Sequence, residues 1–112
     1  MKIAFTAKGP GWEASVDPRF GRTEYLVIFD EEKDELTTID NRDIQNESHG
    51  AGPKTSQILL EQKVQVLVTG NGPGGNAATV LERGKVETYI GAGDTTVREA
   101  YDKFKKGELT KF

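Results

Sequence analysis

Residues 64–81 read VQVLVTGNGPGGNAATVL, and their pattern indicates the fold class of the chain. Val64–Thr69 is a short apolar run that predicts a buried strand. Gly70–Gly75 follows as a glycine loop, after which Ala77, Val80 and Leu81 recur at the spacing of one helix face. A strand, a loop and a helix in direct succession indicate an α/β fold.

The sequence on both sides of this stretch supplies four more strands. They are predicted at Lys2–Ala7, Tyr25–Phe29, Leu36–Ile39 and Val86–Ile90. The second and third strands form a hairpin across the charged turn Asp30–Asp34. Because strand–helix–strand connections join parallel strands, the first, fourth and fifth strands should be parallel, with the hairpin supplying the antiparallel member.

Two further helices complete the predicted fold. One runs from about Pro53 to Lys63, and its periodic face holds Thr55, Ile58, Leu59 and Gln62. The last helix begins at a capping box of Thr96 and Glu99, and its inner face holds Val97, Ala100, Tyr101 and Phe104. The predicted order β-β-β-α-β-α-β-α gives a single domain over residues 1–112. Its mixed five-stranded sheet, with helices on its faces, is of the three-layer, ribonuclease-H-like class.

Composition excludes several classes of function. The net charge is -3 and there is no basic block, which argues against nucleic-acid binding. No apolar run approaches the roughly 20 residues needed to span a bilayer, and the N-terminus carries no secretion signal, so we expect a cytoplasmic location. The chain has no cysteine, which excludes a cysteine-ligated cluster. A bound metal would therefore depend on His49, on carboxylates, or on groups that the ligand brings itself.

The glycines predict where a ligand binds. Of the 13 glycines, Gly84 and Gly107 are explained as helix ends, and the other 11 fall into four groups. These groups lie at residues 9–21, 50–52, 70–75 and 91–93. They follow the four strands that should run in the same direction, so all four loops should converge on one edge of the sheet. Open α/β folds bind their ligands at that edge.

The residues at this edge suit an anion. The glycine groups around Gly70 and Gly91 each open a helix, and a helix N-terminus carries partial positive charge. Arg19 and Arg22 can add forked donors, and His49 is the one side chain in the chain that transition metals prefer.

Plainer interpretations stay open for each of these residues. The glycine loop is also compatible with a tight turn, and His49 with an exposed loop histidine. Arg19 and Arg22 are also compatible with surface pairing to Asp17 and Glu24. Trp12 fits either the core or a lid over the ligand.

Five segments in order along the chain match motifs of one family: DPRFGR (17–22), N…HGAG (46–52), VLVTGNGP (66–73), YIGA (89–92) and TVREA (96–100). They resemble the dinitrogenase iron-molybdenum cofactor biosynthesis family, which includes NifX- and NafY-type carriers and the C-terminal domain of many NifB-type proteins. The chain resembles a stand-alone, single-domain member. One departure is Asp17, which stands where the family often has serine and places a negative charge near the expected site.

The resemblance implies a ribonuclease-H-like domain that binds an iron-molybdenum cofactor, its precursor or a related iron–sulfur cluster, as carrier and not as enzyme. It implies His49 as the metal ligand. The expected binding residues are Arg19, Arg22, Asn46, His49, Gly50, Gly70, Asn71, Gly72, Gly91 and Gly93, with no catalytic residue.

The sequence also bears on two other functions, a nuclease and a binder of small anions. A ribonuclease-H-like nuclease needs carboxylates for divalent metals, and the first strand has no acid in Ile3–Thr6. A binder of phosphate or a nucleotide, or a regulatory module, would use the same loops. The sequence does not separate this alternative from the cluster carrier, and it indicates no protein partner.

Overall fold

The computed structural model describes residues 1–112, with the side chain of Gln45 excepted. Strand β1 lies inside a six-stranded mixed sheet of order β3-β2-β1-β4-β5-β6. The strands are β1 (Lys2–Ala7), β2 (Tyr25–Asp30), β3 (Glu35–Asp40), β4 (Val66–Val68), β5 (Glu87–Ile90) and β6 (Thr110–Lys111). Strands β1, β4 and β5 are parallel, while β2 pairs antiparallel with both β1 and β3. The mixed sheet and its parallel centre are therefore confirmed.

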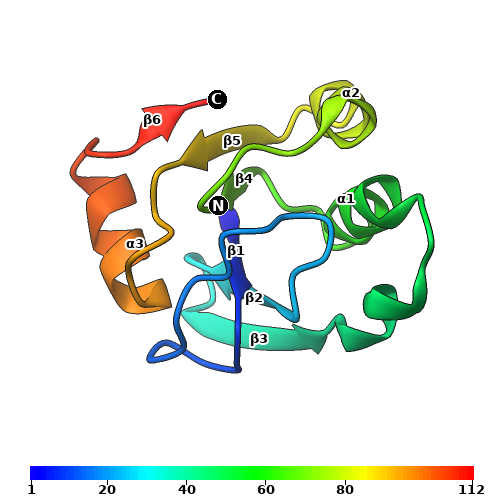
Figure 1. Ribbon diagram of the computed structural model, residues 1–112. Helices are drawn as coiled ribbons and strands as arrows, with labels where there is room; N and C mark the ends of the chain where they lie inside the picture. Colours follow the sequence, from blue (N-terminus) through cyan, green and yellow to red (C-terminus); the bar gives the residue numbers. More distant parts are fainter.

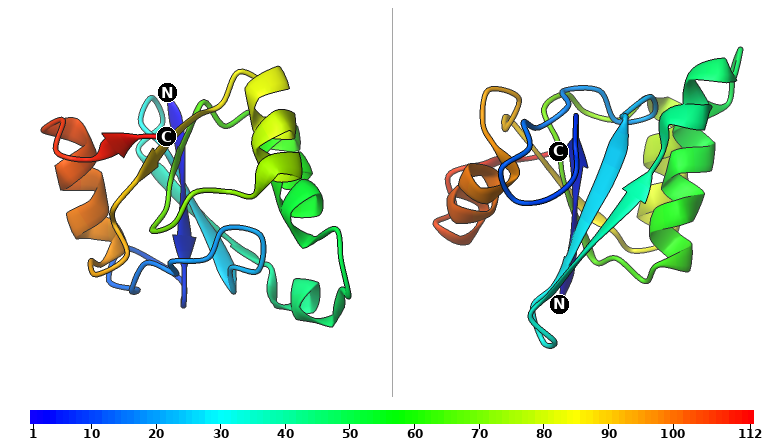
Figure 2. Two further views of the ribbon diagram at one scale, coloured as in Figure 1. Left: turned by 45° about the horizontal axis from the view of Figure 1, so that its top comes forward. Right: turned by 90° about the horizontal axis from the view of Figure 1, so that it is seen from below.

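The helices cover the sheet from both sides (Figure 1). Helices α1 (Ala51–Glu61) and α2 (Gly75–Arg83) lie together on one face, and α3 (Val97–Lys105) lies on the other, as the turned views also show (Figure 2). A short 3-10 helix, η1 (Arg42–Asn46), precedes α1. None of the helices in the described part of the chain is long and apolar enough to cross a membrane.

The two layers of core follow from the alternation of side chains along each strand. In β1, Ile3 and Phe5 point to the α3 side, whereas Ala4 points to the α1 and α2 side, and all three are fully buried. Val97 and Ala100 of α3 close the first layer. Leu59 of α1 and Leu81 of α2 close the second. Each fully buried leucine stabilises the fold by roughly 1.5–3 kcal/mol.

Two details of the predicted fold were wrong. The sheet has six strands instead of five, because β6 pairs antiparallel with β5 after the last helix. Helix α1 begins at Ala51, so Pro53 is its third residue and not its start. Gly84 ends α2 as predicted, since it is the C-cap of that helix, with φ of -82°, and the left-handed residue that follows is Lys85. The name ribonuclease-H-like stays a prediction.

The glycine loops meet at the edge where β1, β3, β4 and β5 end, as their spacing predicted. The N–H of Gly91 donates to the carbonyl of Gly70 at 3.0 Å, and the N–H of Asn71 donates to that of Pro18 at 2.8 Å. A Cβ atom on Gly70 would lie 2.6 Å from the Cα of Pro18 and 3.0 Å from that of Gly93. The loops after β1, β4 and β5 are thus in direct backbone contact.

Candidate functional site

A pocket of about 440 Å³ opens on the α1 and α2 side of this edge. Its walls are the loop residues Arg19–Arg22, the first turn of α1 at Ala51–Pro53, and Gly74–Ala77 at the start of α2. Its volume lies in the range of roughly 300–1,000 Å³ that is typical of small-ligand sites. A larger groove of about 530 Å³ runs between α2 and β6, but Pro73 is the one residue of the glycine loop in its wall. We take the smaller pocket as the candidate site because helix termini and arginines converge on it.

Both helices present uncapped N-termini to the pocket. Helix α1 has Gly50 as its N-cap and α2 has Gly74, and neither cap makes a side-chain hydrogen bond. Glycine has no side chain that could accept from the N–H groups of the first turn, and these groups carry partial positive charge. In α1, Pro53 lacks an N–H, so Ala51 and Gly52 are the donors there. The pocket therefore combines two positive helix ends, which suits an anion.

Helix α3 was expected to supply one of these termini, and it does not. It lies on the other side of the sheet, so Gly91 and Gly93 line no part of the pocket. Its capping box is confirmed, with Thr96 Oγ1 accepting from the N–H of Glu99 at 3.2 Å. The next N–H groups, of Val97 and Arg98, donate to the carbonyls of Ala14 and Trp12 at 2.8 and 2.9 Å. The first-turn N–H groups of α3 are therefore used within the chain. The second helix N-terminus at the pocket is that of α1, and not that of α3 as predicted.

Arg19 is held by a buried carboxylate. Asp17 is fully buried, and its Oδ1 and Oδ2 accept from Nε and Nη2 of Arg19, each at 3.1 Å. Burial alone would raise the pKa of Asp17, but hydrogen bonds from the side chain and backbone of Arg19 and from the backbone of Glu24 outweigh it and hold the pKa below its usual value. The predicted pairing of Arg19 with Asp17 is therefore present, and it joins a half-exposed guanidinium to a fully buried carboxylate.

Arg22 and His49 stand near a second carboxylate. Arg22 Nη1 donates to the carbonyl of Ile44 in η1 at 3.3 Å. Glu47 has a lowered pKa, chiefly because Lys54 donates to it, with smaller contributions from the charges of His49 and Arg22. His49 itself is exposed, two residues before the pocket-lining Ala51. The histidine is thus in the segment that leads into the pocket but is not one of its lining residues.

The predicted residues divide into three groups. Those in the pocket wall or at the N-cap of a helix that lines it are Arg19, Arg22 and Gly50. Those in the segments that lead into α1 and α2 are Asn46, His49, Gly70, Asn71 and Gly72. Gly91 and Gly93 lie at the edge, outside the pocket. Sequence reasoning missed the buried Phe20 and the wall residues Ala51, Pro53, Asn76 and Ala77. The glycine N-caps were the signal that could have located most of them.

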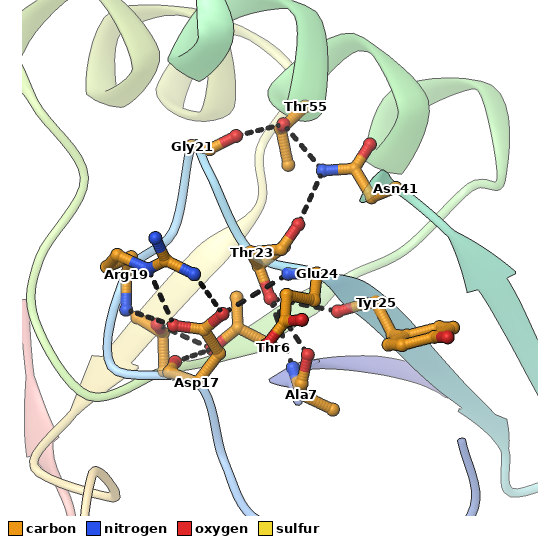
Figure 3. A network of polar contacts seen from close by, with 11 residues as sticks. Thr6, Ala7, Asp17, Arg19, Gly21, Thr23, Glu24, Tyr25, Asn41 and Thr55 are labelled. Carbon is orange, nitrogen blue, oxygen red and sulfur yellow. Dashed lines mark hydrogen bonds and ion pairs between the residues drawn. The ribbon is translucent and has the colours of Figure 1, made fainter. Parts of the chain in front are cut away.

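A buried polar network fixes the loop that carries the arginines (Figure 3). Thr55 Oγ1 of α1 donates to the carbonyl of Gly21 at 2.7 Å and accepts from Asn41 Nδ2 at 3.2 Å. The same Asn41 amide donates to the carbonyl of Thr23 at 3.1 Å, and Thr23 Oγ1 accepts from the N–H of Ala7 at 3.1 Å. Strand β1, the end of β3 and α1 therefore hold Gly21–Thr23 between them, which preorganises the pocket wall.

Replacing Thr55 by valine tests this network. The change keeps the shape of the side chain but leaves the Gly21 carbonyl without its donor and one N–H of the Asn41 amide without its acceptor. The free energy of unfolding should therefore fall by about 1–3 kcal/mol in urea denaturation. Thr79→Val is the matched control, because Thr79 is exposed on α2 and its replacement should change stability by less than about 0.5 kcal/mol. Equal effects of the two changes would show that the network contributes nothing.

The structure settles one alternative that the sequence left open. Trp12 belongs to the core, since its ring packs 4.9 Å from that of Phe29 and 5.6 Å from that of Tyr101 on the α3 side. Within the described residues, no group of three or more histidine, aspartate or glutamate side chains gathers as a metal site. A metal held at the pocket would therefore depend on His49 or on ligands that it brings with it.

Comparisons with known proteins show the family and the fold of the chain. The family model described as dinitrogenase iron-molybdenum cofactor matches residues 1–107. The apo form of the orange protein from Desulfovibrio gigas is 35% identical, with 99% of this chain and 92% of that chain covered and a TM-score of 0.93. A putative NifB protein from Thermotoga, described as belonging to the DUF35 family, is 33% identical over 98% of this chain and 91% of that chain, with a TM-score of 0.84. A search of curated protein sequences gives no match.

Proposed function

The chain belongs to the dinitrogenase iron-molybdenum cofactor family, and from this premise we propose that it binds and carries an iron-molybdenum or related iron–sulfur cluster, or a precursor of one, without turning it over. The observation that carries the proposal is the pocket between two uncapped helix N-termini, with Arg19 and Arg22 in its wall. An anionic cluster is cargo that such a site can hold by hydrogen bonds and partial charges.

The chemistry of the pocket wall favours a preassembled cargo. The chain has no cysteine, so no thiolate is present to assemble or ligate a cluster. The wall residues Gly52, Gly74, Gly75 and Ala77 are small and bring backbone N–H groups close to a ligand. A site of this kind binds a finished anionic group and releases it readily, which is the behaviour of a carrier. The description of the orange protein as an apo form supports a ligand-binding role for the shared fold.

His49 is the proposed metal ligand. It is the single histidine of the chain, and it is exposed in the segment that ends at the N-cap Gly50. A neutral imidazole binds transition metals without adding charge to the pocket. Asn46, at the end of η1, is proposed to contact the same cargo.

The test is retention of metal. Purified protein is mixed anaerobically with extracted iron-molybdenum cofactor and passed through a sizing column, and iron and molybdenum are assayed in the protein peak. Wild type is expected to retain both metals, and His49→Ala to lose them, because the change removes the one imidazole. Ser48→Ala is the control, since Ser48 is the exposed neighbour of His49 and should not alter retention.

Other outcomes have definite meanings. Retention by His49→Ala at the wild-type level would remove His49 as a ligand. Failure of wild type to retain the metals would count against the cluster-carrier proposal.

A binder of phosphate, of a nucleotide or of another small anion, or a regulatory module, is the second candidate. The same uncapped helix ends favour it, since phosphate binds at such termini. Phosphate needs no imidazole, so His49→Ala should spare phosphate binding while it abolishes cluster retention. Titration of wild type and His49→Ala with inorganic phosphate therefore separates the two functions.

A further inference from the structure

Asp17 is a buried negative charge beside a pocket that suits anions. Its side chain is 0% exposed, whereas that of Arg19 is 48% exposed. Oδ1 accepts from the N–H of Arg19 at 3.0 Å and from Arg19 Nε at 3.1 Å, and Oδ2 accepts from Arg19 Nη2 at 3.1 Å and from the N–H of Glu24 at 3.2 Å. Both carboxylate oxygens are therefore engaged, and the charge of Asp17 is directed entirely at Arg19 and at two backbone N–H groups.

The backbone of Asp17 is fixed to the centre of the sheet. Its N–H donates to the carbonyl of Thr6 in β1 at 2.9 Å, and its carbonyl accepts from Thr6 Oγ1 at 2.6 Å. Thr6 Oγ1 in turn lies 2.8 Å from Thr69 Oγ1, just after β4, and both threonines are fully buried. Because β1 and β4 are inner strands of the sheet, the carboxylate is a rigid point of attachment for Arg19.

The ion pair determines how Arg19 faces the pocket. A guanidinium is planar, so a carboxylate that grips Nε and Nη2 fixes the whole plane. The third nitrogen, Nη1, then points away from Asp17, as the close view shows (Figure 3). Arg19 is a wall residue of the pocket, so it offers donors to a ligand from an orientation that is set before binding. The negative charge of Asp17, however, neutralises the positive charge of Arg19.

We propose that Asp17 is a positioning and charge-setting residue of this pocket: it fixes the Arg19 guanidinium and cancels its charge, so that the pocket favours large ligands of diffuse charge over compact polyanions. The proposal rests on the proposed function in taking the same pocket as the binding site. The physical reason is that attraction between full charges grows with the charge of the ligand. With backbone N–H groups and a neutralised arginine, affinity depends instead on shape complementarity and on the number of hydrogen bonds. A large cluster can supply both.

The test compares four proteins: wild type, Asp17→Asn, Arg19→Gln and the double variant. Asp17→Asn makes the pocket more positive by one charge, and Arg19→Gln makes it more negative by one charge. The double variant has the same charge at the pocket as wild type. The probes are nitrate, molybdate and citrate, with one, two and three negative charges, titrated while the amide signals of Gly75 and Ala77 are followed by NMR. The measured quantity is the affinity for citrate divided by that for nitrate.

Asp17→Asn is expected to raise this ratio by about tenfold, Arg19→Gln to lower it by a similar factor, and the double variant to return it towards wild type. A purely structural role for Asp17 would weaken all three probes together and leave the ratio unchanged. A ratio that stays within about twofold of wild type in Asp17→Asn overturns the proposal. If that variant does not fold, an unchanged ratio in Arg19→Gln overturns it instead.

A further readout separates this inference from the proposed function. Exchange of the Arg19 Nε–H with solvent should be slow in wild type and fast in Asp17→Asn, because the bond to Oδ1 protects it. If no probe shifts the Gly75 and Ala77 signals in wild type, the charge-setting role in anion selection fails, while the cluster-carrier function is still decided by metal retention. Slow exchange in wild type would then still support the positioning of Arg19, and equally fast exchange in both proteins would refute it.

Discussion

Aspartate in place of Gly74 is expected to stabilise the folded chain and, at the same time, to weaken anion binding by about tenfold or more. Gly74 is the N-cap of α2, with φ of -66° and ψ of 170°, a conformation that suits an N-cap aspartate. A Cβ built on this residue meets no atom of the described residues within 4 Å. The new carboxylate can therefore accept from the first-turn N–H groups, and the gain in the free energy of unfolding should be about 0.5–1 kcal/mol.

The same carboxylate occupies the donors that a ligand would use, and it adds a like charge to the pocket. Binding of molybdate, followed by the amide signals of Asn76 and Ala77, should fall accordingly. Gly74→Asn is the matched control, since it caps the helix without adding charge and should weaken binding less. Opposite signs for stability and affinity would show that the helix end is left uncapped for a ligand. Molybdate binding at wild-type strength in Gly74→Asp would remove the N-terminus of α2 from the site.

Alanine in place of Gly70 is expected to cause the largest loss of stability among these changes. The added Cβ would lie 2.6 Å from the Cα and 2.9 Å from the Cβ of Pro18, and 3.0 Å from the Cα of Gly93. These are backbone atoms and a ring carbon, which cannot move aside as the end of a long side chain can. The loops after β1, β4 and β5 must separate, and the free energy of unfolding should fall by about 3 kcal/mol.

Denaturation in urea measures this effect, and Gly75→Ala provides the matched control. Gly75 is the first residue of α2, and a Cβ there meets no atom of the described residues within 4 Å. Because alanine is the better helix former, Gly75→Ala should leave stability unchanged or raise it by up to about 1 kcal/mol. If Gly70→Ala is as stable as Gly75→Ala, the close backbone contact is not required by the fold.

The inner strands were predictable because they are short, mainly apolar runs that the fold buries. Lys2–Ala7 was confirmed at both ends, and the hairpin strands are each longer than predicted by one residue at one or both ends. The sixth strand was not predictable, since Thr110–Lys111 are two exposed polar residues that gain strand geometry by pairing with β5. A pattern of two residues has no periodicity to detect.

The sequence predicted the edge of the sheet at which the site lies, but not which helices form its walls. The glycine groups located the edge, because strand direction follows from the order of elements. The face on which each helix packs does not follow from that order, so α3 was assigned to the pocket in place of α1. The capping box at Thr96 and Glu99 was visible in the sequence and already indicated that α3 uses its own donors. The bond from Thr55 to Gly21 was not visible, because it joins residues 34 positions apart.

The single tryptophan of the chain gives this fold an optical property. Trp12 packs on the α3 face among Phe5, Phe29 and Tyr101, so the sheet separates its indole from the pocket. A colourless ligand that fills the pocket does not touch the indole and should leave its fluorescence unchanged. A metal–sulfur chromophore absorbs in the region of indole emission and should quench it by energy transfer through the sheet. Tryptophan fluorescence therefore distinguishes a coloured cargo from phosphate without any added label.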